Sequence, residues 1–203
     1  MKAAALIFDI GNVVVTFDWQ KAAGRLRIPP GNEKVVLLEG FRGLIRRFEA
    51  GEIPREVFVS TAAHAIGFEG EEREFIAIFN SIFDPNPPME RIIRHLAVRF
   101  PLYLLSNTSE IHLEYLQQNF KILRHFKDGV YSFSAKCSKP DPKIFRLAAK
   151  QFGVTPESTV YIDDLPANVR SAVDLGFQAI RYDVSAHAEF ERQLSALGIQ
   201  ISA

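Results

Sequence analysis

The sequence predicts a doubly wound α/β domain, built on a parallel sheet, that carries a small helical insertion. Short apolar runs alternate with segments of helical periodicity, several of these runs end in a polar residue, and one long helical stretch interrupts the alternation early in the chain. Strands that alternate with helices favour right-handed βαβ units, in which helices cover both faces of a parallel sheet. At 203 residues the chain has room for one such domain with an inserted subdomain.

The composition is that of a globular protein without a strong overall charge. Lys and Arg total 24 and Asp and Glu total 24, so no sequence-wide field attracts nucleic acid or an anionic membrane. A single cysteine, Cys137, excludes an intramolecular disulfide framework and is typical of a reducing compartment. No apolar stretch is long enough to span a bilayer. We therefore expect a cytoplasmic protein with a small-molecule partner; the sequence carries no signal for oligomeric state.

A buried strand is expected at the start of the chain. The apolar run over residues 3–8 ends at Asp9, and apolar residues resume at Val13, Val14 and Val15. This pattern indicates a buried strand that is interrupted by a functional turn.

A helical region is expected from Trp19 to about Phe83. Apolar residues recur there at helical intervals, beginning with residues 35–37. Gly51 marks the end of one helix and Pro54 the first turn of the next. The Asp-Pro-Asn-Pro-Pro stretch at residues 84–88 then stops the pattern and is expected to be the return linker.

Further strands alternate with helices after this linker. The strands are predicted at residues 102–105, 129–134, 159–162 and 178–182. Four helices are predicted: one at residues 89–99, one that begins at about residue 110, one that ends at residue 152, and one at residues 167–175. Ser109 is expected to cap the helix that begins near Glu110, and Gly176 to end the helix before the last strand.

Polar residues stand at the ends of three of these strands. Asp9, Ser106 and the pair Asp163 and Asp164 each follow the last apolar residue of an expected strand. In open parallel sheets, ligands bind at the carboxyl ends of the strands. These residues are therefore expected to converge on one crevice, although they are far apart in the sequence.

The side chains expected in this crevice suit magnesium and phosphate. Carboxylate oxygens with few His or Cys ligands favour Mg²⁺ over Zn²⁺. Lys139, beside prolines in a rigid loop, can supply a fixed positive charge, and Ser106 and Asn107 can bind phosphate oxygens together with backbone N–H groups. Each residue alone is also explained by a turn, a helix cap or a solvated surface, so the order of the whole set carries the prediction.

Four segments, in this order, resemble the sequence motifs of the haloacid dehalogenase superfamily. They are Phe8-Asp9-Ile10-Gly11-Asn12, Leu104-Leu105-Ser106-Asn107, Ser138-Lys139-Pro140-Asp141-Pro142 and Tyr161-Ile162-Asp163-Asp164. The resemblance covers nearly the whole chain and implies a Rossmann-like core. It also implies that the protein is a phosphatase, a hydrolase acting on phosphoric monoesters.

The resemblance implies a role for each matching residue. Asp9 would be the covalent nucleophile that attacks phosphorus, and water would then hydrolyse the resulting aspartyl-phosphate. Lys139 would neutralise charge on the nucleophile and the phosphate. Ser106 and Asn107 would hold the phosphoryl group.

The resemblance also implies a Mg²⁺ site. Its ligands would be Asp9, the backbone carbonyl of Gly11, and Asp164 as the direct ligand of the fourth motif, with Asp163 binding through water. The ion would bridge Asp9 and the phosphate and offset charge in the transition state.

The first motif departs from the usual phosphatase pattern at Gly11. Most phosphatases of the superfamily carry a second aspartate there, which protonates the leaving group and later activates water. Positioned acid–base catalysis contributes roughly a hundredfold to ten-thousandfold to the rate, so this loss is large. In a phosphatase without this aspartate, the proton would come from water or from a cap residue. Leaving groups of low pKa, such as an anomeric sugar hydroxyl or an acyl group, would suffer least, so we expect small sugar phosphates as substrates.

Two alternatives to a phosphatase stay open on the sequence alone, and a third is disfavoured. A haloacid dehalogenase would use Asp9 to attack carbon without a metal, but the Asp163 and Asp164 pair argues against it. A catalytically weak binding or scaffold module would retain the fold alone. A phosphomutase is disfavoured, because transfer between two poor leaving groups has most need of the missing acid.

Residues 18–85 are assigned to the cap, and residues 1–17 and 86–203 to the core. In the superfamily, an insertion between the first and second motifs implies a lid that closes over the active site, excludes water and selects the substrate.

Five further residues are left with two interpretations each. Arg42, Arg46 and Arg47 lie on or near one expected helix and either meet an anionic or hydroxyl-rich substrate or form a solvated face. Trp19 either stacks on a sugar or anchors the cap. Asn168 either orients an acid of the fourth motif or caps the next helix.

Overall fold

Five parallel strands form the central sheet of the protein. The computed structural model describes residues 3–25 and 39–201. The strands are β1 (Ala5–Phe8), β4 (Leu102–Ser106), β5 (Asp128–Tyr131), β6 (Thr159–Asp163) and β7 (Gln178–Arg181). Their order in the sheet is β5-β4-β1-β6-β7, and each neighbouring pair is parallel.

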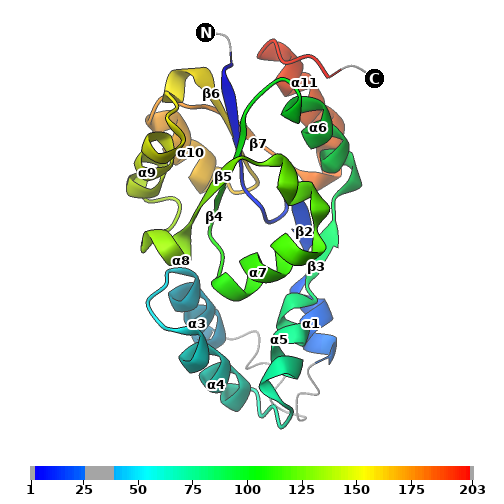
Figure 1. Cartoon of the computed structure of the whole chain (residues 1–203), viewed down its shortest axis with the longest axis vertical. Helices are drawn as coiled ribbons and strands as arrows, with labels where there is room; N and C mark the ends of the chain where they lie inside the picture. The colour runs from blue at the N-terminus through cyan, green and yellow to red at the C-terminus, as the bar shows by residue number, and fades with distance from the viewer. Residues whose placement is uncertain (1–2, 26–38, 202–203) are drawn as a thin grey trace.

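Helices cover both faces of this sheet (Figure 1). One face is covered by α6 (Pro87–Ala97), α7 (Glu110–Asn119) and α11 (His187–Ala196), and the other by α9 (Pro142–Phe152) and α10 (Pro166–Asp174). Alternate side chains of β1 feed the two cores, because Leu6 and Phe8 pack on the first face and Ile7 on the second. The predicted doubly wound parallel sheet is confirmed. In the part of the chain that the structure describes, no helix combines the length and apolar character needed to cross a membrane.

The predicted helix signals are found at two of these helices. At the start of α7, Ser109 Oγ accepts a hydrogen bond from the backbone N–H of His112 at 3.3 Å. After α10, Gly176 adopts a positive φ of 91°, which ends the helix. Local sequence chemistry therefore sets these boundaries.

A two-stranded ribbon joins the core to the inserted helices, where the sequence pattern predicts a helical region up to Phe83 followed by a linker. Strand β2 (Val15–Phe17) pairs antiparallel with β3 (Phe83–Pro85). The segment returns the chain to the core as expected, but its first residues form a strand, because the outgoing and returning segments run side by side and satisfy each other's backbone groups. Strands of three residues are too short to show an alternating pattern in the sequence.

Smaller differences concern the ends of elements. The strand expected over residues 129–134 ends at Tyr131, because residues 132–135 turn into the short helix α8 (Ser132–Ala135). Pro54 precedes α4 instead of lying in its first turn. The apolar set at residues 35–37 lies outside the described residues, so a helix there stays a prediction. Single helical turns complete the chain at Lys121–His125, Pro156–Ser158 and Val184–Ala186.

The inserted helices build a hydrophobic core of their own at the end of the molecule away from both termini (Figure 1). They are α1 (Trp19–Arg25), α3 (Glu39–Glu49), α4 (Arg55–Ala65) and α5 (Glu72–Asn80). The rings of Phe48 and Phe58 stack there at 4.2 Å between centroids. Ile111 of α7 joins the same cluster and so connects it to the core. The predicted helical cap is confirmed, while its boundaries at residues 18 and 85 stay a prediction.

His112 lies where α7 meets the cap. Its ring stacks on Phe79 at 4.2 Å and meets the edge of Phe83 at 4.9 Å. Burial lowers the pKa of His112 to about 3, although a hydrogen bond with the backbone of Phe79 opposes the shift. The imidazole is therefore neutral at physiological pH.

We expect this buried imidazole to make the protein sensitive to acid. Below pH 6.5 the unfolded chain binds a proton at His112 that the folded chain excludes down to about pH 3. Between pH 6.5 and 4, wild-type stability should fall by roughly 1 kcal/mol per pH unit more than that of His112→Phe. Urea midpoints of both proteins across this range test the difference, and parallel curves would contradict it.

Candidate functional site

The predicted site residues gather at the carboxyl ends of three adjacent strands. Asp9 follows β1, Ser106 ends β4 and Asp163 ends β6. β1 and β6 are neighbours, and the connection after β1 leads to α6 on one face of the sheet whereas the connection after β6 leads to α10 on the other, which opens a crevice between their ends. The strand order thus brings together residues that are up to 154 positions apart, from Asp9 to Asp163.

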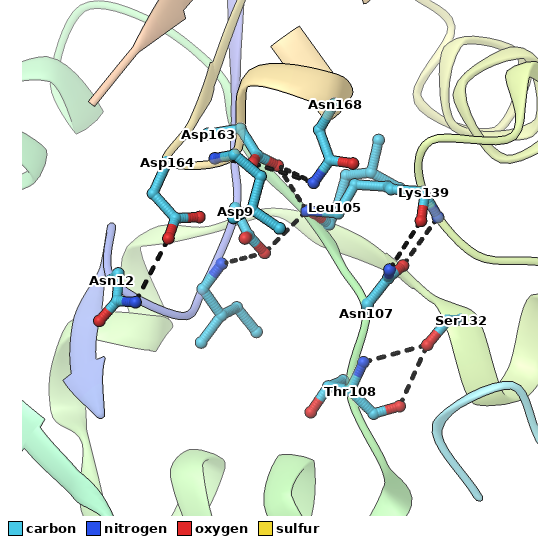
Figure 2. Close-up of polar contacts among 12 residues, drawn as sticks. Asp9, Asn12, Leu105, Asn107, Thr108, Ser132, Lys139, Asp163, Asp164 and Asn168 are labelled. Carbon is cyan, nitrogen blue, oxygen red and sulfur yellow. Dashed lines mark hydrogen bonds and ion pairs between the residues drawn. The ribbon is translucent and has the colours of Figure 1, made fainter. Parts of the chain in front are cut away.

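Lys139 occupies the centre of this crevice (Figure 2). Its Nζ lies 2.9 Å from Asp9 Oδ1 and 2.7 Å from Asp163 Oδ2, and it donates to the carbonyl of Leu105 at 2.9 Å. Burial disfavours the ammonium, but the charges of Asp9 and Asp163 outweigh it and raise the pKa of Lys139. The side chain is therefore a fixed, buried cation.

Asp9 is buried beside this cation. Burial raises its pKa to about 6; the charge of Lys139 opposes the shift, and the charge of Asp163 adds to it. One of its oxygens also accepts the N–H of Ile10 at 2.7 Å. Asp9 is thus ionised at neutral pH with little water around it, a condition that suits a nucleophile.

Asp163 is completely buried, and both of its oxygens are engaged. Besides Lys139, it accepts hydrogen bonds from the hydroxyl of Tyr161, the backbone N–H of Leu165 at 2.9 Å and the amide of Asn168 at 3.0 and 3.1 Å. The interpretation that Asn168 orients an acid of the fourth motif is therefore confirmed. Asp163 holds Lys139 in place and retains little capacity to bind a metal ion, either directly or through water.

Asp164 is the less buried of the two acids and turns toward the first motif. Its Oδ2 accepts from Asn12 Nδ2 at 3.3 Å (Figure 2), and Asn12 adopts a left-handed φ of 54°. Burial raises the pKa of Asp164, and Asn12 opposes the shift. Asp9, Asp163 and Asp164 each offer an oxygen within 4.8 Å of the others. Because the oxygens of Asp163 are already hydrogen-bonded, the donors left for an ion are Asp9, Asp164 and the backbone of Gly11, which lines the same cavity, and these hard oxygens fit Mg²⁺.

Asn107 fastens the loop that carries Lys139. Its side chain donates to the carbonyl of Lys139 at 2.9 Å and accepts from its N–H at 2.8 Å. One N–H and one lone pair of the amide are thereby used to hold the loop, which leaves the backbone N–H of Asn107 as the group best placed for a phosphate contact. Ser106 is buried beside Asp9, where its hydroxyl helps to lower the pKa of that carboxyl.

Gly11 stands where an acid is absent, and the ring of Phe17 lies close to it. A Cβ atom at Gly11 would lie 3.0 Å from Cε1 of Phe17. The aromatic ring therefore crowds the space into which a longer side chain would project. Phe17, in strand β2 of the ribbon, thus packs against the first motif at Gly11.

A cavity of about 760 Å³ extends from these residues to the inserted helices. On the cap side its walls are mainly aromatic, with Phe17, Trp19, Phe41, Phe75, Phe79 and Phe83. Trp19 packs between Phe17 and Phe79, with centroids 6.4 and 5.7 Å away, so it anchors the cap and also faces the cavity.

The three arginines of α3 divide into two groups. Arg42 and Arg46 line the cavity, whereas Arg47 is paired with Glu52 at 3.3 Å on the surface. Glu49 also lines the cavity and was missed by the sequence analysis, as were Asn12 and Tyr161. The Gly-Asn pair of the first motif was a usable signal for Asn12, whereas no motif points to Glu49.

Comparison with known proteins identifies the family to which the chain belongs. Residues 3–176 match the family model of the haloacid dehalogenase-like hydrolases. The chain is 24% identical to D-ribitol-5-phosphate phosphatase of Bacteroides thetaiotaomicron, over 87% of this chain and 90% of that protein. It is 26% identical to 6-phosphogluconate phosphatase of Escherichia coli, over 45% of this chain and 42% of that protein.

A solved structure has a similar fold. It is a HAD family enzyme of Bacteroides thetaiotaomicron in complex with magnesium and inorganic phosphate, with a TM-score of 0.79 and 24% sequence identity. The similarity covers 90% of this chain and 95% of the other.

Proposed function

Because the chain belongs to the haloacid dehalogenase-like hydrolases, we propose that it is a magnesium-dependent phosphomonoester hydrolase that acts through an aspartyl-phosphate on Asp9. The observation that carries the proposal is the buried Lys139, which pairs with Asp9 and Asp163 at the carboxyl ends of the strands. A carboxylate held beside a fixed cation can attack phosphorus while the cation offsets the negative charge of the phosphoryl oxygens. The phosphatase names of the relatives agree with it.

The residues divide the work as follows. Asp9 attacks phosphorus, Lys139 neutralises charge, and Ser106 with the backbone N–H of Asn107 binds phosphoryl oxygens. Asp9, the carbonyl of Gly11 and Asp164 would hold Mg²⁺, which would supply further positive charge to the phosphoryl group.

Asp163 is better described as a positioning residue, because its oxygens are already used by Lys139, Tyr161, Leu165 and Asn168. It does not need to bind the metal for this role. Its place among the metal ligands stays a prediction from the resemblance.

We propose small sugar or polyol phosphates as the substrates. The names of the two curated relatives support this class. A second candidate, a phosphate ester with a flat aromatic leaving group, is favoured by the aromatic wall around Trp19 and Phe41. Arg42 and Arg46 would meet polar groups of either substrate at the edge of the cavity.

A phosphate-release screen with Mg²⁺ tests the function. We expect turnover of hexose 1-phosphates or pentitol 5-phosphates, loss of activity with EDTA, and recovery on adding Mg²⁺. Asp164→Asn should need about tenfold more Mg²⁺ for half-maximal activity, because it removes a charged ligand. Preference for flavin mononucleotide would support the aromatic class.

The alternatives predict different results in the same screen. Halide release from 2-haloacids that persists in EDTA would establish a dehalogenase and overturn the proposal. If no phosphate ester were hydrolysed and Asp9→Asn behaved as wild type, the scaffold reading would replace it.

A further inference from the structure

Glu49 of the cap shares the cavity with the reacting residues. We propose that Glu49 is the general acid and base of this site and does the work of the aspartate that is absent at Gly11. This inference rests on the proposed phosphatase function. Among the described residues that line the cavity, the carboxylic acids are Asp9, Asp164 and Glu49. The first two are assigned to the nucleophile and the metal, so Glu49 is the one left to move a proton.

The position of Glu49 is fixed by backbone contacts with the core. It is the last residue of α3, and its carbonyl accepts a hydrogen bond from Ser132 Oγ. The same oxygen of Ser132 accepts from the N–H of Thr108, in the loop that follows β4, at 3.0 Å. Ser132 thereby links the helix end that carries Glu49 to the loop beside Ser106; Figure 2 shows its contacts with Thr108.

The turn after Glu49 is docked on α8 at a point where only glycine fits. Gly51 has a φ of 66°, and a Cβ atom there would lie 2.1 Å from the carbonyl oxygen of Phe133. Its own carbonyl accepts a hydrogen bond from Lys136 Nζ. This close backbone approach docks the end of α3 against α8, because any side chain at residue 51 would collide with the carbonyl of Phe133.

The side chain of Glu49 has no ion pair or hydrogen bond with any residue that the structure describes. Other charged or titratable residues also line the cavity. They are Asp9 and Asp164 at the strand ends, Lys139 from the loop before α9, Arg42 and Arg46 from the helix that carries Glu49, and His112 from α7. Burial raises the pKa of Glu49 to about 8, the charge of Asp9 adds to this, and Arg46 opposes it. Glu49 therefore holds a proton at neutral pH, as a general acid must.

The chemistry balances over two steps. As Asp9 attacks phosphorus and the bond from phosphorus to the leaving oxygen breaks, Glu49 gives its proton to that oxygen, which departs as an alcohol. The Glu49 carboxylate then takes a proton from water while the water oxygen attacks the aspartyl-phosphate. The bond from phosphorus to Asp9 breaks, inorganic phosphate leaves, and both acids regain their starting states.

This role changes the expected substrate range. With Glu49 as the proton donor, wild type has no need of a leaving group of low pKa, in contrast to what Gly11 alone predicts. Alkyl phosphates and activated esters should both be hydrolysed. A difference in rate between alkyl phosphates and activated esters should appear only when residue 49 can no longer donate a proton.

Glu49→Gln with two esters tests the proposal. For glycerol phosphate, whose leaving group needs protonation, we expect kcat to fall about a hundredfold or more. For p-nitrophenyl phosphate the first step needs no acid, so the variant should release a stoichiometric burst of p-nitrophenolate and then turn over slowly, because the base for the second step is missing. Glu52→Gln, three residues along on the surface, is the matched control and should behave as wild type.

The outcomes separate this inference from the function on which it rests. An equal loss on both esters without a burst, at unchanged thermal stability, would mean that Glu49 only shapes the cavity and would overturn the inference. Wild-type kinetics in Glu49→Gln would overturn it as well. In both cases hydrolysis by wild type keeps the phosphatase function, which fails only if wild type itself hydrolyses no ester.

Discussion

Asp9→Asn is expected to lower phosphate release by about ten-thousandfold or more. The amide has almost the same shape as the carboxylate but cannot form the aspartyl-phosphate. The loss should appear in kcat with every ester, since the same atom attacks phosphorus regardless of the leaving group. Steady-state phosphate release at saturating substrate measures it. Asp174→Asn, an exposed change on α10, is the control and should retain wild-type activity.

The same substitution is expected to leave the protein at least as stable as wild type. Burial raises the pKa of Asp9 from 3.8 to about 6, so above pH 6 the folded state holds a charge that the unfolded state holds more easily. Replacing it with a neutral amide removes this cost, and Lys139 keeps Asp163 as its partner. Thermal unfolding at pH 7.5 in EDTA should give an equal or higher midpoint. A large fall in the midpoint would mean that lost folding explains the lost activity.

Lys139→Met is expected to damage both activity and stability. The change leaves Asp9 and Asp163 buried close together without their shared cation. Breaking a buried pair in this way costs about 3 to 5 kcal/mol. Urea unfolding in EDTA at pH 8 should show this loss, and the deficit should shrink at pH 5, where Asp9 can take up a proton. Lys143→Met, an exposed change on α9, should cost little at either pH.

A double variant separates the two roles of this lysine. Lys139→Met combined with Asp163→Asn removes one of the unpaired charges and should recover much of the stability while activity stays absent. If the single variant were as stable as wild type at pH 8, the buried pairing would not contribute as its geometry indicates. If the double variant regained activity, the cation would not be needed for phosphoryl transfer.

The sheet could be predicted from the sequence because its signals are local. Each parallel strand is buried on both faces and therefore reads as an apolar run, as in β1 and β6. The polar residue that ends each run marks the carboxyl edge of the sheet, where ligands bind. The convergence of Asp9, Ser106 and Asp163 follows from these two facts.

The remaining features depend on packing between distant segments. The β2–β3 ribbon forms because the segment that leaves the core and the segment that returns to it lie side by side, and neither strand is long enough to show an alternating pattern. Glu49 lies in a helical segment like any other surface acid, and it lines the same cavity as Asp9 only once α3 docks on the core, where Gly51 meets α8. Tyr161 reads as a core aromatic of a strand, although its hydroxyl reaches Asp163.

The saturation of Asp163 has a thermodynamic consequence for turnover. A free lysine side chain carries about 2 kcal/mol of rotamer entropy, and a flexible lysine would lose it each time a phosphate bound. With Asp163 held by Tyr161, Asn168 and Leu165, the ammonium of Lys139 is already restricted to one place when the chain folds. The entropy of the Lys139 side chain is therefore lost on folding and not again at each binding event, so more of the binding energy is available to stabilise the transition state.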